Sequence, residues 1–345
     1  MSVVRACGVT GPHVPFQSLE VVRREPGPKD VVIDIKYCGI CHSDIHTVRG
    51  EWKMPPYPLV PGHEITGIVR EVGAAVTRLA VGDRVGVGCM VNSCGECDYC
   101  QRGLEQFCRS GVWTYASRDY DDTITQGGYS RALTVSENWA FPLPDSLDMA
   151  KAAPLMCAGA TTYSPLKRWG AGPGMRVGVI GLGGLGHIAI QIAAAMGAEV
   201  SVISRTLSKK DDGLALGASD YWATSDEATF KTLFASFDFL LCTVSSVQNM
   251  GDYINCLRPG GVLVGVGLPP DPISFPMNAL SRHKSISGSL IAGRKETQEM
   301  LDFCGAHGVE ARIELIRATD IDDTYKRVVA SEVRYRAVLD VETIA

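Results

Sequence analysis

The length, composition and charge of the chain exclude several classes of protein. The chain has 345 residues, 46% of them hydrophobic, and a formal net charge of −5, so it is long enough for two ordinary globular domains with full cores. A charge this mild, without a block of Lys and Arg, gives no electrostatic basis for binding nucleic acid or an anionic membrane. No apolar run approaches the roughly 20 residues that a membrane span requires, and Met1–Thr10 lacks the basic and apolar regions of a signal peptide. We therefore expect a cytoplasmic protein without nucleic acid or membrane as a partner, in which the 12 cysteines are metal ligands or buried thiols.

The first part of the chain, from Met1 to about Asp145, consists of short segments rich in Val, Gly and Pro. Val31–Ile35 is mostly β-branched, and Gly67–Gly73 and Gly82–Val87 begin with glycine. Such segments are typical of short strands joined by tight turns. We expect an irregular β domain here.

Side chains that bind metals are concentrated between Cys38 and Glu64. Cys41 offers a sulfur and His63 a nitrogen, and the Glu64 carboxylate follows directly. A catalytic zinc requires three protein ligands and an open position for water or substrate, and Cys157, at the beginning of a helical segment, can supply the third ligand. Taken singly, each residue is better explained as part of the core, so the prediction depends on their combination. A ligand at Cys157 would place the metal in an interdomain cleft, where small-molecule sites commonly lie.

Four further cysteines, Cys94, Cys97, Cys100 and Cys108, are grouped in one loop. Four thiolates at this spacing suit a closed tetrahedral zinc without an exchangeable position. An iron–sulfur cluster is the competing interpretation, but such runs usually have proline after the fourth ligand, whereas Arg109 follows Cys108. We therefore predict a structural zinc site.

The middle of the chain shows the pattern of a nucleotide-binding domain. From Met175 to roughly Ser289, apolar strands alternate with helical segments, which predicts a doubly wound α/β fold with a parallel sheet. The strand Arg176–Ile180 leads into the glycine loop Gly181-Leu182-Gly183-Gly184-Leu185-Gly186, and a helical segment, Ile188–Met196, follows. Such glycines let the backbone approach a pyrophosphate, and the positive end of the helix faces that charge. This loop is predicted to bind a dinucleotide.

The residues after the second strand of this domain indicate which dinucleotide is bound. An NAD site would carry Asp or Glu roughly 20 residues past the glycines. This chain instead has Ser204, Arg205 and Thr206, followed by Lys209. Hydroxyls and cations suit a 2′-phosphate, so NADP is favoured.

The nicotinamide end of the cofactor is expected where parallel strands end. Open α/β sheets bind their ligands beyond the carboxyl ends of the strands. This rule selects Thr243, after Phe239–Cys242, and Val266, after Val262–Gly265, as cofactor contacts.

Several motifs resemble those of one family. The chain is similar over nearly its whole length to zinc-dependent medium-chain alcohol dehydrogenases, and most resembles the cinnamyl alcohol dehydrogenase-like branch of NADP-dependent aldehyde reductases. Besides the four-cysteine loop, the motifs that carry the resemblance are Cys38–Asp44, Pro61–Glu64, Trp113–Tyr115, Gln126–Tyr129, Ala153–Gly159 and Lys295–Thr297. At Leu290 the chain departs from members acting on aromatic alcohols, which often carry a bulkier aromatic residue there.

The resemblance implies a domain organisation and an assembly. It implies a GroES-like catalytic domain, residues 1–152 with 290–345, and a Rossmann NADP-binding domain, residues 153–289. It also implies a homodimer formed through the edge strands of the Rossmann sheets, with the dimer strand near Ile273–Pro276.

The resemblance further implies a mechanism. Zinc held by Cys41, His63 and Cys157 would polarise the carbonyl of an aldehyde for hydride transfer from NADPH, and Glu64 would coordinate zinc transiently. Ser43, the nicotinamide ribose and His46 would form a proton relay to solvent, Asp44 would orient His63, and Thr161 would contact the cofactor. Aromatic or medium-chain aldehydes and primary alcohols are the expected substrates, with a pocket drawn from Trp52, Met54, Met90, Trp113 and Leu290.

Other classes agree less well with the residues. A metal-free quinone reductase would lack Cys41, His63 and the four-cysteine loop, and a zinc-ribbon nucleic-acid module would show a basic face. An NAD(P)-dependent polyol or secondary alcohol dehydrogenase is the alternative within the family, although the acidic residue typical of its NAD site is absent after Ile203.

Overall fold

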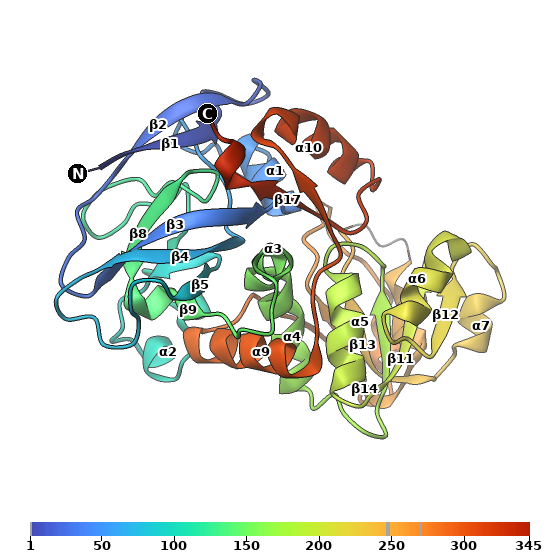
Figure 1. The fold of residues 1–345 in the computed structure, drawn as a ribbon. Helices are drawn as coiled ribbons and strands as arrows, with labels where there is room; N and C mark the ends of the chain where they lie inside the picture. The colour runs from blue at the N-terminus through green and yellow to red at the C-terminus, as the bar shows by residue number, and fades with distance from the viewer. Residues whose placement is uncertain (1, 246–248, 270) are drawn as a thin grey trace. The chain divides into compact units, whose positions relative to one another are not determined.

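The chain folds into two compact units. The structure, a computed structural model, describes residues 2–245, 249–269 and 271–345. One unit comprises Met1–Ala160 and Ala292–Ala345, and the other Thr161–Ile291 (Figure 1). The first and last parts of the chain therefore share one unit, while the middle part forms the other.

The first unit is built on a sheet that joins strands from both ends of the chain. Among the described residues, this sheet has seven strands in the order β16-β17-β3-β4-β5-β9, with β8 also paired to β3. Their bounds are β3 Asp30–Gly39, β4 Ile65–Val72, β5 Arg84–Val87, β8 Ala132–Ser136, β9 Phe141–Pro142, β16 Ile313–Ile316 and β17 Arg336–Asp340. The strands predicted around Val31–Ile35, Gly67–Gly73 and Gly82–Val87 correspond to β3, β4 and β5.

Short elements surround this sheet. Two small ladders are β1 Ser2–Gly8 with β2 Gln17–Arg23, and β6 Met90–Asn92 with β7 Val112–Trp113. The helices are α1 His42–Val48, α2 Asp98–Gln101, α3 Met149–Ala152, α9 Arg294–His307, α10 Ile321–Val329 and the first residues of α4 Ala158–Arg168. The short 3₁₀ turns are η1 Glu105–Phe107, η2 Glu137–Trp139, η3 Ala153–Met156, η6 Ala318–Asp320 and η7 Val341–Thr343.

The alanine-rich segment from Leu147 to Gly170 is not one continuous helix. It is divided into α3, the 3₁₀ turn η3 and α4. Pro154 lies at the start of η3, where its ring and missing N–H interrupt the α-helical hydrogen bonds. The interruption leaves Cys157 between two helical segments, at the end of η3.

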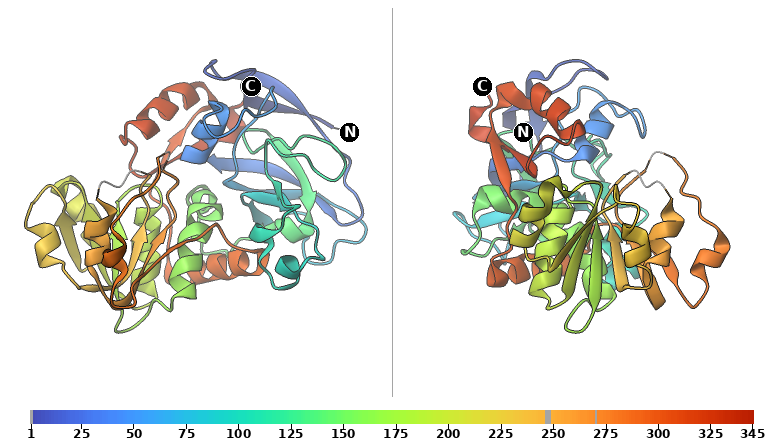
Figure 2. Two further views of the ribbon diagram at one scale, coloured as in Figure 1. Left: turned by 180° about the vertical axis from the view of Figure 1, so that it is seen from behind. Right: turned by 90° about the vertical axis from the view of Figure 1, so that its right-hand side faces the viewer.

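The second unit is a parallel sheet with short helices. Its six strands within the described residues have the order β12-β11-β10-β13-β14-β15, and every neighbouring pair is parallel (Figure 2). The elements are β10 Arg176–Ile180, α5 Gly186–Ala195, β11 Glu199–Ser204, η4 Leu207–Lys209, α6 Lys210–Ala215, β12 Asp220–Ala223, α7 Thr229–Thr232, β13 Phe237–Cys242, α8 Met250–Asn255, β14 Leu257–Gly265, η5 Met277–Leu280 and β15 Ser285–Gly288. The predicted doubly wound α/β fold is confirmed, and its strand order reverses between β10 and β13, where such folds bind their ligands.

The segment expected to form the dimer strand, Ile273–Pro276, pairs with no described strand of its own chain, and the outermost strand on that side of the sheet is β15. Its pairing with a second copy stays a prediction.

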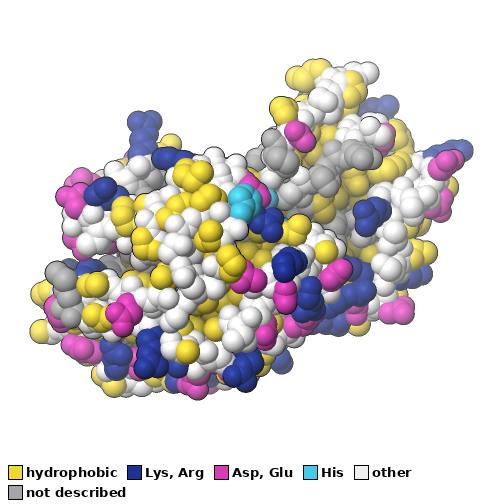
Figure 3. Space-filling model, turned by 90° about the horizontal axis from the view of Figure 1, so that it is seen from above, with side chains coloured by type: hydrophobic (Ala, Val, Ile, Leu, Met, Phe, Trp, Pro, Cys, Tyr) yellow, Lys and Arg dark blue, Asp and Glu magenta, His cyan; other side chains and the backbone are white. Residues whose placement is uncertain are grey.

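On the face shown in Figure 3, basic and acidic side chains are interspersed. No helix in the described part of the chain is both long enough and apolar enough to cross a bilayer.

Candidate metal and cofactor sites

The sheet of the first unit brings Cys41 and His63 together. β3 and β4 are antiparallel, with Cys38 paired to Ile65, so the residues after β3 and before β4 leave the sheet at the same end. The Gly39 N–H donates to the Glu64 carbonyl at 2.9 Å. A Cβ at Gly39 would lie 2.0 Å from Glu64 Oε2, so this close approach requires glycine.

The predicted ligands meet in one buried cluster. The ligand atoms of Cys41, His63, Glu64 and Cys157 all lie within 4.8 Å of one another, and all four residues are buried. Two sulfurs, one imidazole nitrogen and a carboxylate match the donors of a catalytic zinc site. Glu64 Oε2 is buried and finds no hydrogen-bond donor among the described residues, as expected of an oxygen that faces a cation.

Asp44 fixes the orientation of the His63 ring. Asp44 lies in α1 and is fully buried. Its Oδ2 accepts a hydrogen bond from the Cys41 N–H at 2.9 Å, and its Oδ1 accepts one from the Gly62 N–H at 3.1 Å. Oδ1 also lies 2.9 Å from His63 Nδ1, which leaves Nε2 available to a metal. Burial lowers the pKa of His63, but the Asp44 carboxylate outweighs it, and the pKa stands well above the usual value.

Two other thiols, Cys41 and Cys89, interact with the Cys157 thiol at this cluster. A hydrogen bond with Cys157 holds the pKa of the Cys41 thiol well below its usual value, and the same contact raises that of Cys157. Cys157 also hydrogen-bonds to Cys89, which follows β5 and is half-buried. Because metals bind the thiolate form, the low pKa of Cys41 prepares one ligand. Cys89 belongs to no motif of regularly spaced cysteines, so its place in this cluster was not predicted from the sequence.

The Glu64 carboxylate has a buried counter-ion. Arg336, in β17, forms an ion pair with Glu64. The arginine is only 4% exposed and the glutamate 0%, so both charges depend on this contact. No sequence pattern pointed to Arg336, which lies far from Glu64 along the chain.

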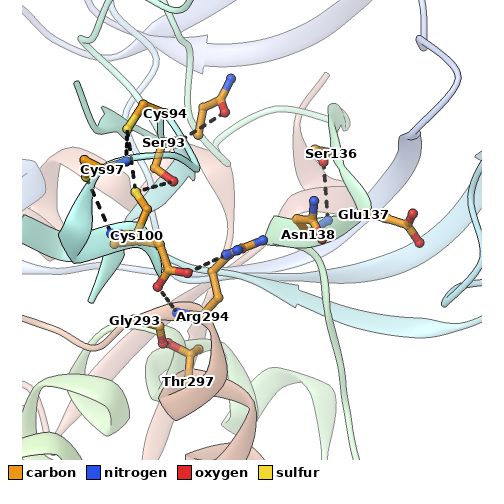
Figure 4. A network of polar contacts seen from close by, with 12 residues as sticks. Ser93, Cys94, Cys97, Cys100, Ser136, Glu137, Asn138, Gly293, Arg294 and Thr297 are labelled. Carbon is orange, nitrogen blue, oxygen red and sulfur yellow. Dashed lines mark hydrogen bonds and ion pairs between the residues drawn. The ribbon is translucent and has the colours of Figure 1, made fainter. Parts of the chain in front are cut away.

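The four-cysteine loop forms a second cluster, in which the ligand atoms again lie within 4.8 Å of one another. Cys94 Sγ lies 3.5 Å from Cys108 Sγ and 3.9 Å from Cys100 Sγ. The Cys97 N–H donates to Cys94 Sγ at 3.4 Å, and the Cys100 N–H donates to Cys97 Sγ at 3.5 Å (Figure 4). The first of these hydrogen bonds lowers the pKa of Cys94 to about 7. Four sulfurs, two of which accept backbone N–H groups, fit a closed zinc site.

An ion pair joins the end of this loop to α9. Arg294 Nε donates to Glu105 Oε1 at 2.8 Å, and the Arg294 N–H donates to Glu105 Oε2 at 3.0 Å (Figure 4). Glu105 is buried, so α9 is held against the segment that carries Cys108.

In the second unit, the glycine loop has the shape of a phosphate cradle. Gly181 has a φ of +93°, and a Cβ at Gly186 would lie 2.0 Å from the Gly181 carbonyl oxygen, so the turn requires glycine at both positions. A Cβ at Gly183 would meet nothing within 4 Å, which leaves space over the loop. α5 begins at Gly186, so its N-terminus faces that space.

Among the other predicted cofactor residues of this unit, Thr243 contacts the glycine loop. Thr243 Oγ1 donates to the Ile180 carbonyl at 2.8 Å, and the Val266 N–H donates to the Cys242 carbonyl at 2.9 Å. Leu185 precedes α5, and Thr161 is a buried residue of α4.

The residues predicted to bind the 2′-phosphate lie at the end of β11. Ser204 ends the strand, and Arg205 and Thr206 are exposed. Lys209 Nζ donates to the Leu182 carbonyl at 3.1 Å. Lys209 is therefore beside the glycine loop, a second role that spacing alone did not indicate.

The predicted relay residues share the short helix α1. Ser43 is half-buried, and His46 Nδ1 pairs with Glu51. The His46 ring stacks on Trp52 with the ring centroids 5.0 Å apart.

The residues predicted to line the substrate pocket differ in exposure. Trp52, Met54 and Trp113, all in the first unit, are exposed, whereas Met90 is buried. Leu290 is exposed and belongs to the second unit.

Comparison with known proteins shows the family. Residues 27–145 match the alcohol dehydrogenase GroES-like domain, and residues 184–306 match the zinc-binding dehydrogenase domain. The chain belongs to the zinc-binding alcohol dehydrogenase family, and the resemblance inferred from its motifs is confirmed.

Individual relatives are similar over the whole chain. NADP-dependent alcohol dehydrogenase C 1 of Mycolicibacterium smegmatis is 53% identical, covering 100% of this chain and 99% of the relative. Aldehyde reductase YahK of Escherichia coli is 44% identical, covering 99% of both. Among solved structures, a cinnamyl alcohol dehydrogenase from Sorghum bicolor superposes with a TM-score of 0.96 at 37% identity, covering 100% of this chain and 99% of the other. The CAD protein of Helicobacter pylori, solved with NADP(H), superposes with a TM-score of 0.93 at 40% identity, covering 99% of both.

Proposed function

We propose that the protein is an NADP-dependent oxidoreductase that interconverts aldehydes and primary alcohols at a zinc site. The observation that carries this proposal is the buried cluster of Cys41, His63, Glu64 and Cys157, with Asp44 behind His63. Without a metal, Glu64 Oε2 would stay buried with no donor among the described residues. The names of the relatives, NADP-dependent alcohol dehydrogenases and an aldehyde reductase, support the same activity.

Two zinc ions per chain fit the two donor sets. Cys41, His63 and Cys157 would hold the catalytic ion, and Glu64 would coordinate it when water or substrate leaves. The four-cysteine loop would hold the structural ion. Bound at these sites, zinc would supply a Lewis acid for the carbonyl oxygen. NADPH, bound at the glycine loop, would supply the hydride.

The side chains of the protein position the reactants and carry the proton. Asp44 pairs with His63 Nδ1, which would leave Nε2 to bind the metal. Ser43 and His46, on one face of α1, would pass the hydroxyl proton to solvent. The exposed aromatic and sulfur-containing side chains Trp52, Met54 and Trp113 would contact an apolar substrate.

The cofactor would be held by its phosphates. The glycine loop and the N-terminus of α5 suit the pyrophosphate. Ser204, Arg205, Thr206 and Lys209 suit a 2′-phosphate, because hydroxyls and cations form charge-assisted hydrogen bonds with it. Thr161, Thr243 and Val266 would contact the nicotinamide half.

We further propose a cytoplasmic homodimer. β15 is the outermost strand of its sheet, and an outer strand can pair with a second copy. Analytical ultracentrifugation tests this proposal, and a monomer at micromolar concentration would contradict it.

The decisive test of the function is a panel of substrates with both cofactors. Purified protein is assayed with aromatic, medium-chain and branched aldehydes, with primary alcohols and with polyols, each with NADP(H) and NAD(H). The highest kcat/KM should belong to aldehydes with NADPH. A preference for polyols or secondary alcohols with NAD would favour the alternative dehydrogenase, and the absence of hydride transfer throughout would refute the proposal.

A further inference from the structure

A buried histidine with no role in the function described so far lies in the first turn of α5. His187 is 0% exposed. Its backbone N–H donates to the Gly183 carbonyl at 3.1 Å, and its ring nitrogen Nδ1 lies 3.1 Å from the same oxygen. A carbonyl oxygen only accepts hydrogen bonds, so Nδ1 carries a proton and donates it. One residue therefore supplies two donors to one carbonyl of the glycine loop.

Side chains from two other segments contact the preceding carbonyls of the loop. Thr243, which follows β13, has its Oγ1 3.2 Å from the Gly181 carbonyl oxygen. Lys209, in η4, donates from Nζ to the Leu182 carbonyl at 3.1 Å. With the Gly183 carbonyl, three consecutive carbonyls of the loop each have a side-chain partner. Side chains thus fix the orientation of three peptide groups in the loop.

The orientation of a carbonyl decides where the next N–H points. In a planar trans peptide, the carbonyl oxygen and the N–H of the following residue point in opposite directions. The Gly183 carbonyl points along α5 toward His187, so the Gly184 N–H points the other way, out of the N-terminus of the helix. The first N–H groups of a helix have no carbonyl partner within it. The Gly184 N–H is therefore directed to where a phosphate oxygen would be bound.

We propose that His187 is a positioning residue for the pyrophosphate of the cofactor, acting through the peptide group between Gly183 and Gly184. Its Nδ1–H keeps the partly negative Gly183 oxygen turned away from the phosphates and directs the Gly184 N–H toward them. A loop that is ordered before the cofactor arrives loses less conformational freedom on binding. The role rests on the proposed function, because it presumes a dinucleotide at the glycine loop.

The test removes the Nδ1 donor and then restores it. His187→Leu fills the buried position without a donor, whereas His187→Asn places an amide N–H close to the position of Nδ1–H. Binding of NADPH and of NADH, which share the pyrophosphate, is measured by fluorescence titration without substrate. H187L should weaken both cofactors about fivefold, the typical effect of one lost hydrogen bond, and H187N should recover most of that loss. Both variants lack the rest of the imidazole, so their difference reports the donor alone.

Two fragments of the cofactor show which phosphate is affected. 2′-Phospho-ADP-ribose keeps the pyrophosphate and lacks the nicotinamide, whereas adenosine 2′-monophosphate has no pyrophosphate. Calorimetry should find that H187L weakens binding of the first fragment about fivefold and leaves the second unchanged. Equal losses for the two fragments would overturn the proposal, because they would indicate a general distortion of the unit. Unchanged binding of the first fragment would contradict it directly.

A matched control lies on the same helix. The Gln191 side-chain amide donates to the His187 carbonyl at 3.0 Å, so Gln191→Leu removes a hydrogen bond of the same kind, one turn further from the loop. Q191L should leave the affinity for every ligand unchanged. A loss as large as that in H187L would show that any weakening of α5 has this effect, and the proposal would be wrong.

A second comparison decides the question if H187L does not fold. H187N is then compared with His187→Gln, whose longer side chain places its amide nearer the position of Nε2. H187N should bind 2′-phospho-ADP-ribose more tightly than H187Q, and equal affinities would refute the role of the Nδ1 donor.

Failure of the proposed cofactor would look different. If wild type binds neither NADPH nor NADH, the cofactor assignment fails and the role of His187 fails with it. If wild type binds them and H187L binds them equally well, only the role of His187 fails.

Discussion

Replacing the cations after β11 tests how the protein selects its cofactor. Lys209 is half-buried beside the glycine loop, whereas Arg205 is exposed. A charge-assisted hydrogen bond to phosphate contributes about 1.5–3 kcal/mol where it is shielded from water and about 1 kcal/mol or less where it is exposed. Since 1.4 kcal/mol corresponds to a factor of ten, Lys209→Ala should lower kcat/KM with NADPH by about 10–100-fold, and Arg205→Ala by about fivefold or less.

The structure adds an asymmetry between the two variants. Lys209 also donates to the Leu182 carbonyl, so its loss removes a hydrogen bond from the loop that every dinucleotide uses. At about 1 kcal/mol, K209A should lower kcat/KM with NADH by about fivefold, whereas R205A should leave NADH unaffected. Wild type should prefer NADPH over NADH by about two orders of magnitude in kcat/KM. Adding Ser204→Asp to a variant that combines R205A and K209A should reverse that preference, because the new carboxylate repels the 2′-phosphate of NADPH and accepts a hydrogen bond from the 2′-hydroxyl of NADH.

The assay is steady-state kinetics with each cofactor at saturating aldehyde. Lys210→Ala, at the exposed neighbour of Lys209, is the matched control and should leave kcat/KM unchanged with both cofactors. Equal use of NADPH and NADH by wild type, or equal losses for both cofactors in R205A, would refute the assignment.

Three further predictions concern the metal sites. His63→Ala and Cys157→Ala should each abolish turnover but keep NADPH binding, because the glycine loop lies in the other unit. Fluorescence titration with NADPH measures the binding. Near-normal turnover in either variant would exclude the cluster as the active site. Elemental analysis should find two zinc ions per chain. Brief chelation should remove one zinc and abolish the activity while the circular dichroism spectrum stays unchanged, because a closed site lacks an exchange position. One zinc per chain, or iron, would contradict this prediction. In metal-depleted protein, iodoacetamide should modify Cys94 at a rate that rises as the pH passes about 7, because the thiolate is the nucleophile. Burial raises the pKa of Cys304 to about 12, so mass spectrometry should find Cys304 unmodified at neutral pH.

Local sequence patterns predicted the elements whose signals are short-range. The strand, glycine loop and helix from Arg176 to Met196 are one continuous pattern, and β10 and α5 occupy it. The amphipathic helix α10 was missed, although Ile321, Thr324, Tyr325 and Val328, all buried, have helical spacing. The helical spacing of these buried residues is visible in the sequence, so this helix could have been predicted.

Contacts between distant segments could not be predicted in the same way. Arg336 reaches Glu64 only because β17 pairs with β3, which in turn pairs with β4. An isolated arginine or cysteine has no spacing partner, so neither Arg336 nor Cys89 carried a sequence signal.

The two clusters that we propose to bind zinc depend on the fold to different degrees. The four-cysteine loop draws its ligands from residues 94–108, and two of its sulfurs accept backbone N–H groups within that segment. The other cluster draws Cys41, His63 and Cys157 from three segments that meet only once β3 and β4 are paired and η3 is in place. Bringing distant residues together has an entropic cost that the whole sheet must offset. The closed site can therefore support folding of its own loop, whereas the open site is a product of folding, and the hydrogen bonds on Asp44 hold its geometry.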